Sequence, residues 1–220
     1  MEVLITDITV MDGDNYCVAG WSAGEGKMIR PLPSGHHWSA GLLAKHSIAP
    51  GSLINVRPTG KPNGTFPHRT EDTPINPEMI QLITAGFADW TGPTAPPAAT
   101  TIMEGFSGNV LWNSVWQNVR QGVYVSERKQ CASLAAIVVD RPGITLREDF
   151  GKLKAVVSDG QDRYKLAVSS RVLREAWEQG GLASAEAVLP ARQQLHVRVG
   201  LARTYQGEPV KCYMMLNGVL

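Results

Sequence analysis

The chain has 220 residues, of which 43% are hydrophobic and 19% charged, with 21 basic against 20 acidic side chains. This composition excludes global disorder, and a net charge of +1 excludes a protein that coats polyanions over its whole surface. The longest fully apolar stretches, such as residues 134–139, are far shorter than the ~20 residues of a membrane-spanning helix. The three cysteines are widely spaced and form no CxxC pair. We therefore expect a cytoplasmic globular protein in a reducing compartment, with no membrane partner.

The balanced total charge hides a gradient along the chain. Residues 71–150 carry five basic and nine acidic side chains, whereas residues 151–220 carry ten basic and six acidic ones. The last third is therefore the best electrostatic candidate for contact with a phosphate-bearing ligand. The alternative is an ordinary solvated surface with an excess of lysine and arginine.

The first 60 residues have the pattern of short strands. Residues 3–10 and 16–21 are rich in strand-forming side chains and flank a turn that contains Asp12-Gly13, which predicts a hairpin. Residues 27–32 and 52–57 are the next two predicted strands. Eight of the 14 prolines then fall between residues 58 and 97, which indicates irregular backbone. Within this stretch, residues 77–83 are predicted as a short helix, and residues 91–101 as a linker or a long packed loop.

The C-terminal half returns to strands. Residues 133–140 predict a buried strand, and residues 152–158 and 163–169 form the clearest hairpin, around Asp159-Gly160. Residues 170–179 predict the one convincing helix, which Gly180-Gly181 ends. Residues 195–203 and 210–216 predict two further strands. Many short strands with few helices favour small barrels, and two five-stranded OB barrels would fit this length.

The familiar catalytic motifs are absent from the sequence. It contains no GxxxxGK[ST], GxSxG or HExxH motif, and no GxGxxG between a strand and a helix. His36, His37 and His46 could bind zinc together, but their spacing matches no metal motif. We expect no catalytic residues, no metal and no cofactor.

Two groups of side chains could recognise a ligand, because aromatic rings stack on bases and cations contact phosphates. The first group comes from the N-terminal strands, and the second from the C-terminal ones. The alternative is that the tryptophans pack in the core and that Arg30 forms a structural ion pair. The first group is Trp21, Arg30, His36, His37 and Trp38, and the second is Lys152, Lys154, Arg163, Lys165, Arg198, Arg203 and Tyr205.

Several of these segments resemble one protein family. Residues 16–21 (YCVAGW), followed by residues 28–32 (MIRPL), resemble the opening strands of dual OB-containing domain proteins, and residues 200–205 and 212–219 resemble their end. The hairpin of residues 155–169 is similar to a later strand pair of the family. The resemblance implies a bacterial protein with two fused OB-like barrels, and it implies nucleic acid or a nucleotide as the ligand. Arg30 and Arg203 are the polar residues inside the matching motifs.

The sequence therefore predicts a mainly β protein of two fused OB-like β-barrels with a few short helices. We expect the first barrel over residues 1–125, with a proline-rich insertion or linker over about 58–101, and the second over residues 126–220. The function we expect is non-catalytic binding of single-stranded nucleic acid or a nucleotide by a cationic groove and aromatic stacking. The alternatives are an enzyme that processes nucleotides or nucleic acid with the His36/His37/His46 loop, and a scaffold that binds a protein partner.

Overall fold

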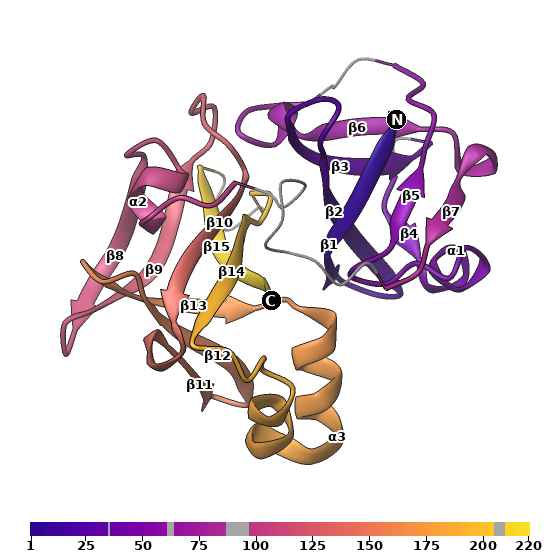
Figure 1. Ribbon diagram of the computed structural model, residues 1–220. Coiled ribbons are helices and arrows are strands. Elements are labelled where there is room, and N and C mark those ends of the chain that lie inside the picture. The colour runs from indigo at the N-terminus through magenta and orange to yellow at the C-terminus, as the bar shows by residue number, and fades with distance from the viewer. Residues whose placement is uncertain (35, 61–63, 87–96, 205–209) are drawn as a thin grey trace. The chain divides into compact units, whose positions relative to one another are not determined.

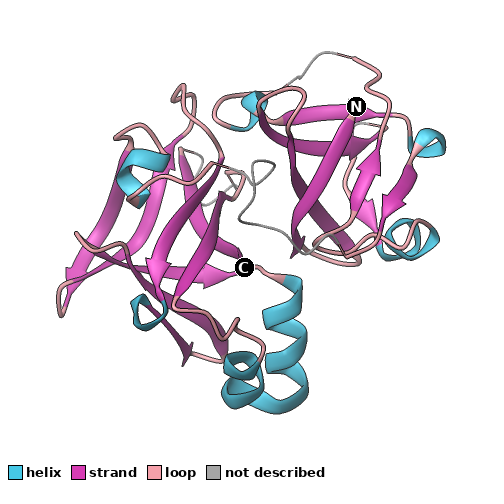
Figure 2. Ribbon diagram, in the orientation of Figure 1, coloured by secondary structure: helices cyan, strands magenta, loops and turns pink. Residues whose placement is uncertain are grey.

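The fold is mainly β and consists of two compact units (Figures 1 and 2). The structure is a computed structural model, and it describes residues 1–34, 36–60, 64–86, 97–204 and 210–220. Unit 1 comprises Met1–Gly64 and Arg69–Pro97, and unit 2 comprises Thr65–His68 and Ala98–Leu220. Each unit contains its own curled β-sheet and its own hydrophobic core. This confirms the predicted fold class.

Unit 1 has the connectivity of an OB-like barrel. Its first three strands form an antiparallel meander, a short helix follows, and β5 then returns to pair with β1. The barrel closes at β6, which pairs in parallel with β3 and, through an antiparallel bridge between Ile75 and Pro58, with the chain that follows β5. The elements are β1 (Glu2–Val10), β2 (Asn15–Ser22), β3 (Lys27–Pro33), β4 (Trp38–Ser39), α1 (Ala40–Lys45), β5 (Leu53–Asn55), η1 (His68–Thr70), β6 (Asp72–Ile75), η2 (Pro77–Met79) and β7 (Gln81–Thr84).

Unit 2 repeats this plan with one addition. A first strand made of β10, η3 and β11 leads into β12 and β13, and α3 then connects β13 to β14 and β15. As in unit 1, a parallel pair closes the barrel, here β13 with β15. The hairpin of β8 and β9 is the addition. The elements are α2 (Ile102–Gly105), β8 (Val110–Trp116), β9 (Val119–Ser126), β10 (Leu134–Asp140), η3 (Arg141–Gly143), β11 (Ile144–Asp149), β12 (Lys152–Ser158), β13 (Arg163–Val168), α3 (Arg171–Ala187), β14 (Gln194–Leu201) and β15 (Lys211–Val219).

The boundary between the units lies near residue 97 and not at the expected position, residue 125. Residues 110–126 belong to unit 2 because β9 pairs with both β15 and β13. The proline-rich stretch also has a structural role, since β6 within it is the strand that closes the barrel of unit 1. The predicted linker over 91–101 lies largely outside the described residues.

The predicted helix over residues 77–83 is wrong. Asn76 caps a single 3-10 turn, accepting a hydrogen bond from the Glu78 backbone N at 2.9 Å. The chain then extends, because Ile80 enters the core of unit 1 and residues 81–84 pair with β5 as β7. By contrast, the helix predicted over 170–179 forms the first part of α3, and the backbone leaves helical conformation at Gly180 and Gly181 as expected.

A buried ion pair joins the two strands that close unit 1. Arg30 on β3 lies opposite Asp72 on β6, and its Nη1 donates to the Asp72 Oδ1 at 2.5 Å. Only 5% of the Arg30 side chain and 3% of the Asp72 side chain are exposed. Burial opposes the charge on Arg30, but nearby groups, Asp72 among them, outweigh burial and raise its pKa. Arg30 thus has a structural partner, which was the alternative raised for this residue.

We predict that Arg30→Met lowers the free energy of unfolding by about 3–5 kcal/mol, because it leaves the carboxylate of Asp72 buried without its partner. Chemical denaturation of both proteins would measure the difference. The control is Lys45→Met, which breaks the exposed Lys45–Glu78 pair and should cost less than about 1 kcal/mol. Equal effects of the two substitutions would contradict the prediction.

Candidate functional site

The outer surface of β11, β12 and β13 carries five cations on one face. The strand register places Arg147 opposite Lys154, and residues directly opposite one another point to the same side of a sheet. Lys152 lies two residues before Lys154, so it shares this side. Across the next strand pair, Val156 lies opposite Lys165 and Ser158 opposite Arg163. We call this set the basic face; its members are Arg147, Lys152, Lys154, Arg163 and Lys165.

The positive charge of the basic face is only partly neutralised. Arg147, Lys152 and Arg163 are exposed, and Lys154 and Lys165 are half-buried. One carboxylate shares the face, that of Asp149, which forms an ion pair with Lys165. Burial lowers the pKa of Lys154, and the neighbouring charges of Lys152 and Lys165 lower it further.

The inner side of the same strands is apolar and fixes the register. Leu153, Ala155 and Val157 of β12 and Leu166 and Val168 of β13 belong to the core of unit 2. Because side chains alternate along a strand, burial of this set directs the lysines and arginines outward.

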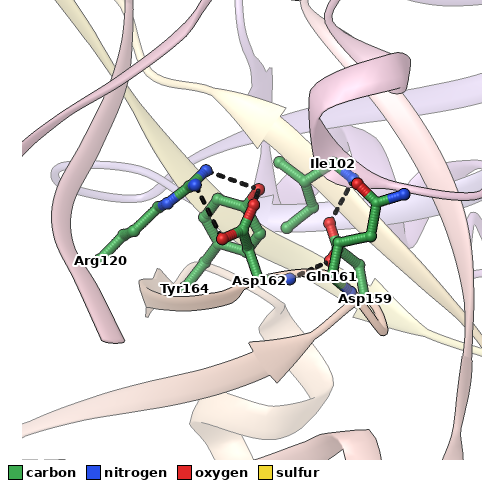
Figure 3. A network of polar contacts seen from close by, with 6 residues as sticks. All are labelled: Ile102, Arg120, Asp159, Gln161, Asp162 and Tyr164. Carbon is green, nitrogen blue, oxygen red and sulfur yellow. Dashed lines mark hydrogen bonds and ion pairs between the residues drawn. The ribbon is translucent and has the colours of Figure 1, made fainter. Parts of the chain in front are cut away.

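The hairpin loop between β12 and β13 is held by the carboxylate of Asp159 (Figure 3). Its Oδ1 accepts hydrogen bonds from the backbone N of Gln161 and Asp162 at 3.1 and 2.9 Å. Its Oδ2 accepts from the backbone N of Ile102, the first residue of α2, at 2.9 Å. One buried carboxylate therefore both forms the turn and ties the hairpin to a distant segment.

A second part of this network anchors β13 to β9. Arg120 on β9 forms an ion pair with Asp162 at 2.7 Å and donates to the Tyr164 hydroxyl at 3.1 Å (Figure 3). The guanidinium also lies 3.8 Å from the centre of the Trp112 ring. Burial, together with the charge of Asp159, raises the pKa of Tyr164, so this side chain remains a neutral phenol. Arg120 thus links β9 to β13, one of the strands that carry the basic face.

The N-terminal group predicted as a ligand site does not form an exposed aromatic surface. Trp38 is fully buried, and its Nε1 donates to the Pro31 carbonyl at 2.7 Å. Trp21 is half-buried on β2, opposite Leu4 and Met28. His36 is exposed and His37 half-buried. Arg30 is buried in its ion pair with Asp72. For Trp38 and Arg30, therefore, the alternative of a core residue and a structural ion pair is the correct one.

Three residues of the predicted C-terminal group, Arg198, Arg203 and Tyr205, are not members of the basic face. Arg198 on β14 is only 2% exposed, so its side chain is not open to a ligand, although its neighbours Val197 and Val199 are the residues of β14 that enter the core. Arg203 is exposed just after β14. Tyr205 lies outside the described residues. The structure therefore unites four of the predicted residues, Lys152, Lys154, Arg163 and Lys165, on one face.

Within the part of the chain that the structure describes, no group of three His, Cys, Asp or Glu side chains is arranged to hold a metal ion. His36, His37 and His46 therefore do not form a group of this kind. Also within the described residues, no helix is long and apolar enough to cross a membrane.

Two residues that the sequence analysis did not select belong to this region. Arg147 joins the basic face because the β11–β12 register places it opposite Lys154. Phe150 lies at the tip of the same hairpin and is 98% exposed. The signal that could have found Phe150 is the Phe-Gly pair between two strand-like segments, since that position is a turn in which an aromatic ring has no core to enter.

No family model matches the chain, and no curated protein does. Two solved structures resemble it over nearly its full length. One, described as the p204 HINb domain, is 12% identical with a TM-score of 0.32, covering 99% of this chain and 91% of that chain. The other, a murine DNA-binding protein bound to double-stranded DNA, is 6% identical with a TM-score of 0.35, covering 100% and 95%. With similarities this low, neither bears on what this chain binds.

We predict that protonation of His196 on β14 destabilises the fold. Burial lowers the pKa of His196 below its usual 6.5, and the charges of Arg198 and Arg192 lower it further. The unfolded chain therefore binds a proton more readily than the folded one, so stability falls as the pH drops below about 6.5. The measurement is denaturant unfolding of the wild type and His196→Gln between about pH 7 and pH 5. The stability advantage of the wild type should shrink on acidification, and a constant difference would contradict the prediction.

Proposed function

We propose that the protein binds nucleic acid through the basic face of unit 2. The observation that supports this most strongly is the set of five cations on one face of β11–β13, accompanied by one carboxylate. In an OB barrel the surface of the second and third strands is the usual site for oligonucleotides. In unit 2 those strands are β12 and β13, which supply four of the five cations.

The chemistry of the face suits a phosphate backbone. Lysine ammonium groups act as point charges that contact phosphates without selecting a base, and the two arginines can bind phosphate oxygens with two hydrogen bonds. Residues two apart on a strand are separated by about 7 Å, so Lys152 and Lys154 form a row along β12. Binding of this kind releases counterions from the nucleic acid and weakens steeply with salt.

The equivalent strands of unit 1 support a different role. β2 and β3 carry Arg30, but its charge is compensated inside the fold by Asp72. We therefore assign the nucleic-acid contact to unit 2 and give Trp38 and Arg30 of unit 1 a structural role. Lys152, Lys154, Arg163 and Lys165 remain the proposed ligand contacts from the sequence, with Arg147 added.

We predict that the double substitution Lys152→Gln and Lys154→Gln weakens binding to a labelled oligonucleotide and flattens its salt dependence. Removing two lysine–phosphate interactions should reduce the steepness of the plot of log K against log salt concentration by about 1.4–1.8, which is about 0.7–0.9 for each. Fluorescence anisotropy over a series of salt concentrations gives both quantities. Unfolding curves of the variant establish that the fold is retained.

The matched control is Arg174→Gln, which removes a cation of the same unit from α3, where it is paired with Glu178. Arg174 lies on α3 and not on β11, β12 or β13, so it is not a member of the basic face. The control should bind with the wild-type affinity and slope. Wild-type protein that shows no salt-sensitive binding to any oligonucleotide would refute the proposed function.

A further inference from the structure

The turn between β11 and β12 contains an aromatic residue, Phe150, in the left-handed backbone conformation that glycine and asparagine adopt more easily. Phe150 and Gly151 are the two central residues, with φ values of 50° and 67°. Asp149 and Lys152 pair across this turn as the ends of the two strands. Positive φ at both central residues is the pattern of a type I′ turn, for which Asn-Gly and Asp-Gly are the preferred pairs. A phenylalanine in this position is strained by its Cβ.

The Phe150 ring does not pack against the rest of the fold. The residue is 98% exposed, so no packing compensates for the strained backbone or for the apolar surface left in water. The other two-residue hairpin of unit 2 makes the same kind of turn with polar residues. It joins β8 to β9 through Gln117 and Asn118, whose φ values are 49° and 59°. An aromatic residue is therefore not required for such a turn.

The surroundings of Phe150 indicate what the ring could contact. The turn it forms leads directly into Lys152, and Arg147 lies opposite Lys154 further along the same hairpin. An exposed ring beside a row of cations is the combination that binds single-stranded nucleic acid, because a base stacks on the ring while its phosphates meet the cations. In a duplex the bases are already stacked on one another, so the ring has no free base face to cover.

We propose that Phe150 stacks on an unpaired nucleobase and thereby makes the protein selective for single strands. This inference rests on the proposed function, because the basic face holds the phosphate backbone of the same ligand. The β11–β12 turn supplies the base contact, and the strands supply the charge. The geometry also explains why a strained and fully exposed aromatic residue is present at the tip of this hairpin.

The test compares Phe150→Asn and Phe150→Trp with the wild type, using an oligothymidylate single strand and a duplex of equal length. Phe150→Asn should weaken single-strand binding about 5- to 150-fold, the range expected when one stacked base is removed. It should change duplex affinity less than about twofold, and it should not lower the melting temperature, because asparagine suits the turn. Phe150→Trp should retain single-strand affinity.

The matched control is Trp116→Asn, which removes another exposed aromatic side chain beside the turn of the β8–β9 hairpin. It should leave both affinities unchanged. Single-strand affinity that is unchanged in Phe150→Asn, or that falls equally for duplex and single strand, overturns the inference. So does an effect confined to binding of vesicles that contain anionic lipid, which would make the ring a membrane contact.

The two proposals fail in different ways. Suppose that Lys152→Gln/Lys154→Gln weakens binding to both probes while Phe150→Asn changes neither affinity. The role of the basic face is then supported, and the stacking role of Phe150 is refuted. If the wild type binds neither probe at any salt concentration, the proposed function falls and the stacking role falls with it.

Discussion

The alternation of side chains along β12 and β13 is the constraint on which the rest of unit 2 depends. The inward set, which includes Ala155, Val157 and Leu166, fills a closed barrel and cannot be moved outward without losing the core. A shift of one residue in either strand would exchange the two sides, placing lysines in the core and aliphatic side chains in water. Packing inside the barrel therefore determines the charge outside it, and the hydrogen bonds and ion pair of Asp159 and Asp162 hold this register at the hairpin loop.

The two units share a connectivity but place their charged side chains differently. In unit 1 the parallel pair that closes the barrel contains Arg30 and Asp72, which neutralise each other away from water. In unit 2 the corresponding pair, β13 with β15, brings Ala167 opposite Met215 and contains no such ion pair in its register. The cations of β12 and β13 instead face outward. One topology thus provides a structural ion pair in one unit and a charged surface in the other.

Residue spacing predicted which cations of β12 and β13 share a strand face. Lys152 and Lys154, and likewise Arg163 and Lys165, are two residues apart, and strand periodicity places each pair on one face. Whether both pairs share that face depends on the hairpin register, which the loop of residues 159–162 sets. The N-terminal group was predicted from proximity along the chain. Proximity along the chain does not report burial. Trp38 packs in the core of unit 1, where the Pro31 carbonyl accepts a hydrogen bond from its indole N–H.

By itself, the sequence determined the strand-rich character of the chain, the hairpins around its Asp-Gly turns and the basic bias of the last third, because periodicity, turn chemistry and charge are local properties. The tertiary structure alone decided where the two units divide, which arginines are buried, and that Arg147 joins the four predicted cations. These features depend on pairing between strands far apart in the chain. The exposure of Phe150 is of the same kind, since an aromatic residue is taken to be buried until the fold shows that no core lies within its reach.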